Sequence, residues 1–222
     1  MKAIIFDFDG TLTKSKKGSN CWRKTWDYLD DLEYDNKLYE MYKRNEINDD
    51  EWLELIFQRY VEKGLNDQAM QEISDKIDLL DGVEETFEKL KENNVKIYIL
   101  SGGIRQIIEK VLNREGVLDY VSSFEAYNLN FDEEGKLVGY SSPRHNVEKK
   151  YEFVEILKKQ LGIDSKEILF VGNGKNDEEV YKSGVKTLCI NPDGADFENR
   201  LVWTYAIEEC SSMCDILKYC EF

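Results

Sequence analysis

The stretch that decides the fold is residues 5–13, which read Ile5-Phe6-Asp7-Phe8-Asp9-Gly10-Thr11-Leu12-Thr13. The apolar run 3–6 is typical of a buried parallel strand, and the Gly-Thr pair that follows turns the chain away. Asp7 and Asp9 are therefore expected at the carboxyl end of a sheet, where open α/β folds place their active sites. Two carboxylates there can hold a hard cation, with one as nucleophile and the other as proton carrier. The alternative is a surface turn with two solvated acids.

The composition is that of a folded protein with a sizeable core. The chain has 222 residues, 41% hydrophobic and 12% aromatic, which suits one α/β domain with an insertion or two small domains. The formal net charge of −15 argues against nucleic acid as a partner, because phosphate backbones call for Lys and Arg patches. No apolar run approaches the ~20 residues that cross a bilayer, and Asp7 interrupts any signal-peptide core. We therefore expect a soluble, cytoplasmic protein without a membrane partner.

The cysteines do not form a metal-binding pattern. The chain has five of them, and neither a CxxC pair nor a neighbouring histidine accompanies the three near the carboxyl end. Zinc binding is therefore poorly supported. Free thiols in a reducing compartment are the better interpretation. The five residues are Cys21, Cys189, Cys210, Cys214 and Cys220.

Three apolar runs predict strands, and each ends in small polar residues. Residues 3–6 end in Asp7, residues 96–100 in Ser101-Gly102-Gly103, and residues 167–171 in Gly172-Asn173-Gly174. Helical periodicity separates the later strands. Strands that alternate with helices predict an α/β fold with a doubly wound, Rossmann-like parallel sheet. The polar strand ends should then meet along one edge.

Two shorter elements are expected beyond the alternating core. Residues 131–138 indicate a hairpin that turns near Gly135. Residues 211–219 indicate a closing helix with Met213, Ile216 and Leu217 facing inward. A helix over 147–161 with Asn146 as its N-cap is also expected.

The stretch of about 65 residues between the first two strands is too long for a structureless loop. Its periodicity is helical, most clearly over Asp50–Lys63. We predict that residues 15–79 form a helical cap inserted into a catalytic core made of residues 1–14 and 80–222. Trp22, Trp26 and Trp52 are expected in the core of this small bundle, since aromatic residues dominate small cores.

The motif DFDGTLT resembles the first motif of the haloacid dehalogenase superfamily, whose phosphatases form a phospho-aspartate on the first Asp. The resemblance implies that Asp7 is the nucleophile and Asp9 the general acid and base. Ser101 in ILSGG resembles the second motif, with its hydroxyl on a phosphoryl oxygen. Gly102 and Gly103 are expected to offer backbone N–H groups to substrate at a helix amino terminus.

The third and fourth motifs are also matched. Lys150, twelve residues before Gly162, resembles the lysine that offsets charge on nucleophile and phosphate, although the adjacent Lys149 is an alternative. GNGKND at 172–177 resembles the motif usually written GDGxND. The resemblance implies a Mg²⁺ site formed by Asp7, Asp9, Asn173 and Asp177. Asn173 stands where the family has a carboxylate, so it supplies oxygen without charge.

Within the superfamily, the chain resembles the phosphoserine phosphatases. Arg59 stands where that family has a cap arginine for the substrate carboxylate, and a solvated helix face is the alternative. Lys16 stands where the family has a glutamate for the substrate ammonium, so phosphoserine is not a secure substrate.

These observations predict a Mg²⁺-dependent phosphomonoesterase that acts on a small phosphorylated metabolite through a phospho-aspartate. The alternatives are a phosphatase of another small phosphate, such as a phosphosugar, nucleotide or vitamin phosphate, and a phospho-ligand binding or regulatory protein with weak turnover. The sequence makes no prediction about the oligomeric state.

Overall fold

The computed structural model describes residues 1–14, 17–143 and 149–222. Within these residues, seven strands form one sheet in the order β4-β3-β2-β1-β5-β6-β7. All neighbouring pairs are parallel except β3 and β4, so the predicted doubly wound parallel sheet is confirmed with one antiparallel edge strand. The strands are β1 (Ala3–Phe6), β2 (Lys96–Ile104), β3 (Val121–Phe131), β4 (Leu137–Ser141), β5 (Ile168–Gly174), β6 (Lys186–Asp193) and β7 (Tyr205–Ile207).

Strand β1 lies at the centre of the sheet because all of its side chains are apolar and buried on both faces. Its last residue, Phe6, is in register with Ile99 of β2 and Val171 of β5. The Asp7 amide continues the ladder and donates to the Val171 carbonyl oxygen at 2.9 Å. The polar ends of three strands are thereby brought to the same edge, as the sequence predicts.

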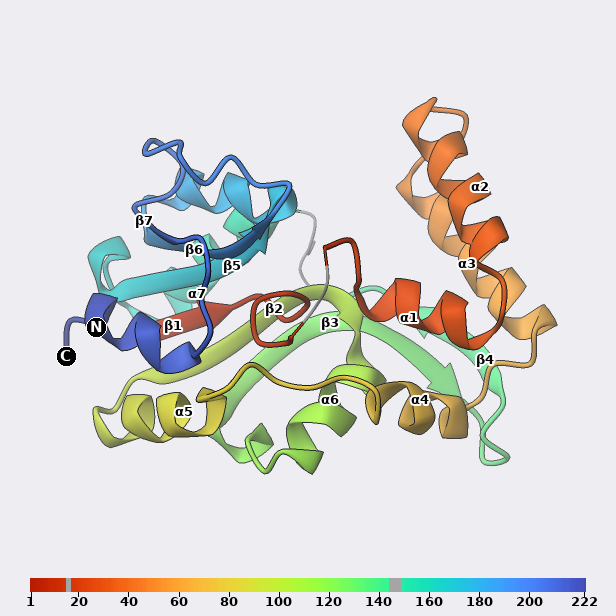
Figure 1. The fold of residues 1–222 in the computed structure, drawn as a ribbon, viewed down its shortest axis with the longest axis horizontal. Coiled ribbons are helices and arrows are strands. Elements are labelled where there is room, and N and C mark those ends of the chain that lie inside the picture. Colours follow the sequence, from red (N-terminus) through yellow and green to blue (C-terminus); the bar gives the residue numbers. More distant parts are fainter. Residues whose placement is uncertain (15–16, 144–148) are drawn as a thin grey trace.

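Helices cover both faces of the sheet (Figure 1). Alternate residues of the central strands divide between two apolar clusters, since successive strand side chains point to opposite faces. One cluster includes residues of α5 and α6, and the other includes residues of α7 and η3. The core helices are α5 (Val83–Glu92), α6 (Arg105–Arg114), α7 (Lys150–Leu161) and the short 3₁₀ helices η1 (Leu118–Tyr120), η2 (Ser165–Glu167), η3 (Lys175–Ser183) and η4 (Met213–Tyr219).

The segment between β1 and β2 is helical, as predicted. Asn48 caps α3 through a reciprocal capping box with Glu51, which satisfies backbone N–H groups at both residues. Figure 1 shows α2 and α3 as a projecting pair, whereas α4 lies beside α6. The division of the chain at residues 15 and 79 stays a prediction. Before α5, the described part of this segment contains α1 (Cys21–Tyr28), α2 (Leu32–Lys43), α3 (Asp49–Glu62) and α4 (Asp67–Ser74).

The predicted hairpin is confirmed and supports the projecting helices. Strands β3 and β4 are joined by a turn in which Gly135 has a φ of +77°, a conformation that favours glycine. From β4, the Tyr140 ring lies 5.2 Å from the Phe57 ring of α3. The Tyr140 hydroxyl also donates to Glu54 at 3.3 Å. The hairpin therefore contacts the base of the helical pair.

Two helix boundaries differ from the sequence-based expectation. The closing helix begins at Met213 and is 3₁₀, with Met213 and Ile216 buried and Leu217 half-buried. Helix α7 begins at Lys150, while the expected N-cap Asn146 lies outside the described residues. The cysteines are free, as expected, and Cys214 is half-buried while the others are buried.

Arg114 joins the core to the end of α4, because its guanidinium donates to the Ser74 carbonyl oxygen at 2.7 Å and also to that of Ile77. We predict that Arg114→Ala lowers the free energy of unfolding by about 1.5–3 kcal/mol, measured by urea denaturation. The control is Arg44→Ala, whose exposed pair with Glu46 spans 3.8 Å and should contribute less than about 0.5 kcal/mol. Equal losses in the two variants would contradict the bridging role of Arg114.

Candidate active site

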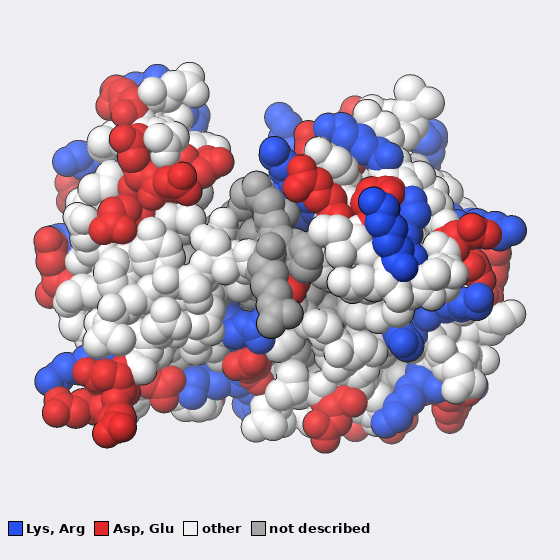
Figure 2. Space-filling model, turned by 180° about the vertical axis from the view of Figure 1, so that it is seen from behind, with Lys and Arg blue, Asp and Glu red and all other residues white. Residues whose placement is uncertain are grey.

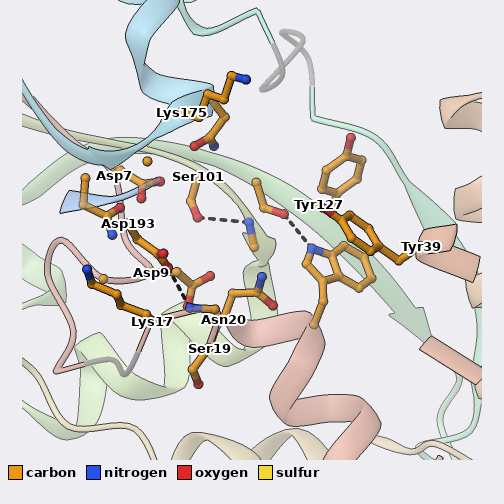
Figure 3. Close-up of a pocket in the computed structure, with 18 of the residues that line it drawn as sticks. Asp7, Asp9, Lys17, Ser19, Asn20, Tyr39, Ser101, Tyr127, Lys175 and Asp193 are labelled. Atoms are coloured by element: carbon orange, nitrogen blue, oxygen red, sulfur yellow. Dashed lines mark hydrogen bonds between the residues drawn. The ribbon is translucent and has the colours of Figure 1, made fainter. Parts of the chain in front are cut away.

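A pocket of about 520 Å³ opens at the carboxyl edge of the sheet, between the strand ends and the projecting helices. Figure 3 shows Asp7, Asp9, Ser101 and Asp193 on one side of it, with Tyr39 and Tyr127 on the other. The pocket therefore has a polar end at the sheet and an aromatic end at the cap. Its size falls within the range of roughly 300–1,000 Å³ that small-molecule sites occupy.

A buried lysine holds two carboxylates together beneath the polar end. Lys150 Nζ lies 2.8 Å from Asp7 Oδ1 and 2.6 Å from Asp177 Oδ1, and its side chain is 0% exposed. Lys149 is exposed, and its Nζ lies 3.8 Å from Glu152. The sequence left either Lys149 or Lys150 as the lysine of the third motif, and Lys150 is the one that contacts Asp7.

Asp177 shapes the loop of the fourth motif. Its Oδ2 accepts from the backbone N–H groups of Asn173 at 3.0 Å and Gly174 at 2.9 Å. Both carboxylate oxygens are therefore engaged within the protein, and Asp177 is buried outside the pocket lining. Asp177 thus serves as acceptor for Lys150 and for the loop backbone, and its role as a metal ligand stays a prediction.

Lys150, Asp7 and Asp177 form a buried triad, in which the pKa values of Asp7 and Lys150 are shifted. Burial, together with the negative charge of Asp177, raises the pKa of Asp7 to about 7 against the opposing effect of Lys150. For Lys150, burial acts to lower the pKa, but the charges of Asp177 and Asp7 outweigh it and raise the pKa above its usual value. Lys150 is therefore a permanent positive charge beside Asp7.

Asp9 is tied to the first cap helix. Its Oδ1 accepts from the backbone N–H of Cys21 at 3.1 Å and from Cys21 Sγ at 3.3 Å. Burial raises the pKa of Asp9 to about 6, although the Cys21 contacts oppose the shift. A carboxyl group with that pKa can both donate and accept a proton near neutral pH. Cys21 carries no sequence signal for this role, because the contact depends on where α1 begins.

Ser101 presents its hydroxyl at the polar end, but the glycines after it differ from expectation. Strand β2 continues through Gly102 and Gly103, and α6 begins only at Arg105. The Gly103 N–H donates to Ser101 Oγ at 3.0 Å, which leaves that hydroxyl hydrogen free to face a ligand. Gly102 and Gly103 therefore precede the helix instead of opening it, but both line the pocket, and their predicted contact with substrate stays a prediction. A side chain at 103 would approach Asp9 Oδ2 to 3.0 Å, so glycine keeps room for Asp9.

Oxygen donors of the kind that Mg²⁺ accepts line the polar end. Asp7 and Asn173 both face the pocket, and Thr11 Oγ1 lies 3.4 Å from Asn173 Oδ1. Asp193 of β6 adds a carboxylate that the sequence did not indicate, and its Oδ2 accepts from the Gly18 N–H at 2.7 Å. Among the described residues, no three His, Cys, Asp or Glu side chains form a metal-binding cluster. The donor chemistry thus fits Mg²⁺, with less charge than three carboxylates would give.

The three tryptophans between β1 and β2 differ in their surroundings. Trp26 is buried against Tyr60, with ring centroids 4.5 Å apart, as predicted. Trp22 and Trp52 are half-buried and pack against the same core, as predicted, but both also line the pocket, which the sequence did not indicate. Each therefore has one side on the core and another on the cavity.

Arg59 lies outside the pocket lining. Its Nε lies 2.7 Å from Asp31 Oδ2 and its other arm lies 2.9 Å from Glu62, with the guanidinium over the Tyr34 ring. This pairing favours the alternative of a structural helix-face arginine over a substrate-binding one. Lys16 lies outside the described residues.

The family model for haloacid dehalogenase-like hydrolases matches residues 1–183. The chain belongs to this family. It is 28% identical to a phosphoserine phosphatase of Archaeoglobus fulgidus over 184 residues, which cover 79% of this chain and 48% of that protein. It is also 28% identical to a 2-hydroxy-3-keto-5-methylthiopentenyl-1-phosphate phosphatase of Microcystis aeruginosa over 172 residues, which cover 74% of this chain and 75% of that protein.

The same fold occurs in a solved structure described as a phospho-aspartyl intermediate analogue of phosphoserine phosphatase. Its TM-score is 0.73 at 22% identity, with 99% of each chain covered. Among the curated relatives, this chain spans about half the length of the phosphoserine phosphatases that it matches first. Among the described residues, no helix is long and apolar enough to cross a membrane.

The buried triad makes a clear prediction for stability. Lys150→Met leaves Asp7 and Asp177 adjacent and buried without a cation, and should lower the free energy of unfolding by about 3–5 kcal/mol. Urea denaturation measures the loss. Lys149→Met is the matched control, because Lys149 is exposed and should change stability by less than about 0.5 kcal/mol. A stable Lys150→Met protein would show that the triad does not hold the site together.

Proposed function

We propose that this protein is a phosphomonoesterase that hydrolyses a small phosphorylated molecule through a phospho-aspartate on Asp7. The observation that carries the proposal is the Asp7 carboxylate at the polar end of the pocket, with Lys150 Nζ at 2.8 Å behind it and Asp9 on the same edge. The names of the two relatives, both phosphatases of small phosphate esters, support the same reaction class.

In the first half-reaction, an Asp7 oxygen attacks phosphorus and forms an acyl–phosphate bond while the bond from phosphorus to the substrate oxygen breaks. Asp9 in its acid form gives its proton to the leaving oxygen, so the alcohol departs neutral. Lys150 offsets the negative charge at Asp7, and the Ser101 hydroxyl donates to a phosphoryl oxygen.

In the second half-reaction, Asp9 takes a proton from water, and that water attacks phosphorus and releases phosphate. Asp7 is regenerated as a carboxylate and Asp9 as an acid. The pKa of Asp9, raised to about 6 by burial, suits both directions of transfer. The Cys21 contacts keep its carboxyl oriented between the two steps.

Magnesium completes this proposal. Asp7, the backbone carbonyl of Asp9 and Asn173 would hold it, and when bound it would draw charge from the phosphoryl oxygens. Asp193 lines the same pocket and adds negative potential. Asp177 is not assigned as a ligand, since its oxygens already accept from Lys150 and two backbone N–H groups.

A phospho-ligand binding protein with weak turnover is the second candidate, and Asn173 is the observation that favours it. A neutral amide in place of a carboxylate weakens cation binding, which the reaction needs. The intact set of Asp7, Asp9, Ser101 and Lys150 makes hydrolysis the preferred function.

The proposal predicts that Asp7→Asn lowers phosphate release by about a thousandfold or more, because an amide is a poor nucleophile at phosphorus. Phosphate release from an aryl phosphate with Mg²⁺ is the measurement, and the acid-labile phospho-enzyme should disappear. Asp9→Asn should retain some phospho-enzyme with an activated leaving group. The control is Asp49→Asn, whose carboxylate lies at the cap end of the pocket. Normal turnover by Asp7→Asn would overturn the assignment.

Asn173 predicts how metal and substrate bind together. With one formal charge from its protein ligands, Mg²⁺ should bind weakly until a substrate phosphate contributes its own charge. Asn173→Asp should tighten Mg²⁺ binding by about tenfold and reduce this cooperativity. Calorimetric titration with and without a non-hydrolysable phosphate analogue tests the effect, with Asn176→Asp as the control in the same loop. Unchanged Mg²⁺ affinity in Asn173→Asp would place the cation elsewhere.

A further inference from the structure

The end of the pocket away from Asp7 is lined by aromatic and aliphatic side chains. Figure 3 shows Tyr39 and Tyr127 on this side, across the cavity from Asp7 and Asp9. We call this end of the pocket the ring subsite. It is formed by Trp22, Tyr39, Tyr42, Trp52, Leu53, Ile56 and Tyr127.

Four of the five aromatic rings of the ring subsite form two interacting pairs. Trp22 and Tyr127 meet edge to face, with centroids 5.7 Å apart. Tyr42 and Trp52 stack, with centroids 5.1 Å apart and planes inclined by 25°. Such pairs hold ring orientation and leave flat faces and edges that a further ring can contact.

The ring subsite is fixed to the catalytic strand. Trp22 Nε1 donates to the Gly102 carbonyl oxygen at 2.7 Å, directly after Ser101. The indole therefore stands beside the place where the phosphoryl group would bind. A group joined to the phosphate by a short linker would therefore lie against the indole of Trp22.

The charges of the pocket disfavour a carboxylate at this end. The described cationic side chains of the lining are Lys17 and Lys175, and both are next in sequence to glycines at the polar end, Gly18 and Gly174. Asp49, an anionic side chain, lies among the lining residues of α3. Arg59 is paired with Asp31 and Glu62 away from the lining. Figure 2 shows acidic side chains gathered on the projecting helices, which adds negative potential around the cap.

We propose that the substrate of this site is a phosphomonoester whose alcohol carries a planar aromatic ring, and that the ring binds in the ring subsite. This inference rests on the proposed phosphatase function and names its substrate class. Two sources share the chemistry. A nucleoside 5′-monophosphate carries the ring through ribose, and a pyridoxal-type phosphate carries it through one methylene group.

The test compares kcat/KM for ring-bearing and ring-free phosphates with Mg²⁺. The panel is AMP, UMP, pyridoxal 5′-phosphate, phosphoserine and glycerol 2-phosphate. We expect at least one ring-bearing substrate to exceed both ring-free ones by about tenfold or more, since stacking of one base on aromatic side chains gives that factor. The nucleotide and pyridoxal arms distinguish the two sources. Preference for phosphoserine or glycerol 2-phosphate would overturn the inference while leaving the proposed function standing.

Substitutions in the ring subsite test whether its side chains cause the preference for ring-bearing substrates. Trp52→Leu and Tyr42→Leu should each lower the ratio of ring-bearing to ring-free kcat/KM by about tenfold, and Trp52→Phe should restore much of it. Tyr42 is 36% exposed, so its variant tests the subsite even if Trp52→Leu does not fold. Tyr219→Leu is the matched control, because it breaks the stacked pair of Tyr205 and Tyr219 outside the pocket lining. An unchanged ratio in Tyr42→Leu would overturn the subsite.

A binding measurement separates this inference from the proposed function. The Asp7→Asn protein is titrated with adenosine, uridine and pyridoxine, which lack the phosphate, and with glycerol as the ring-free probe, while tryptophan fluorescence is recorded. Quenching by a ring compound that Tyr42→Leu weakens supports the ring subsite even if no phosphate ester is hydrolysed. Absence of quenching by all three ring compounds would overturn the inference even if hydrolysis occurs.

Discussion

The contact of Lys150 with Asp7 and Asp177 is the interaction on which the site depends. All three side chains are buried, and the charge of the lysine offsets two carboxylates whose burial would otherwise be very unfavourable. Because Asp177 of η3 also accepts from two backbone amides at the end of β5, the lysine connects three separate parts of the chain. Asp7 is thereby positioned by α7 and η3 as well as by its own strand.

The fold follows from short-range features of the sequence. Apolar strands that end in small polar residues predicted the central sheet, because a buried parallel strand needs an uninterrupted apolar run and its active edge needs acids, hydroxyls or glycines. The same reasoning placed Asp7, Ser101 and Asn173 on one edge, and the structure brings them there. The hairpin around Gly135 was predictable for a similar reason, since a positive φ at that turn selects glycine.

The contacts that complete the site were not predictable, since each depends on tertiary geometry. Asp193 faces the pocket only because β6 lies beside β5, and Cys21 reaches Asp9 only because α1 begins next to it. Gly102 and Gly103 resemble a helix start in sequence, yet pairing with β3 extends the strand to Ile104. Periodicity reports which side of an element is apolar, and it cannot tell whether that side meets a core or a cavity, as Trp22 and Trp52 illustrate.

The two contacts of α1 with the sheet have a consequence for how specificity can change in this architecture. Cys21 and Trp22 contact Asp9 and Gly102, so α1 is bonded directly to motif residues of the sheet edge. The α2–α3 pair instead supplies much of the far wall of the cavity. Substitutions at the pocket-facing positions of α2 and α3 are therefore expected to change which group fits beside the phosphate, whereas substitutions in the first turn of α1 would also disturb Asp9.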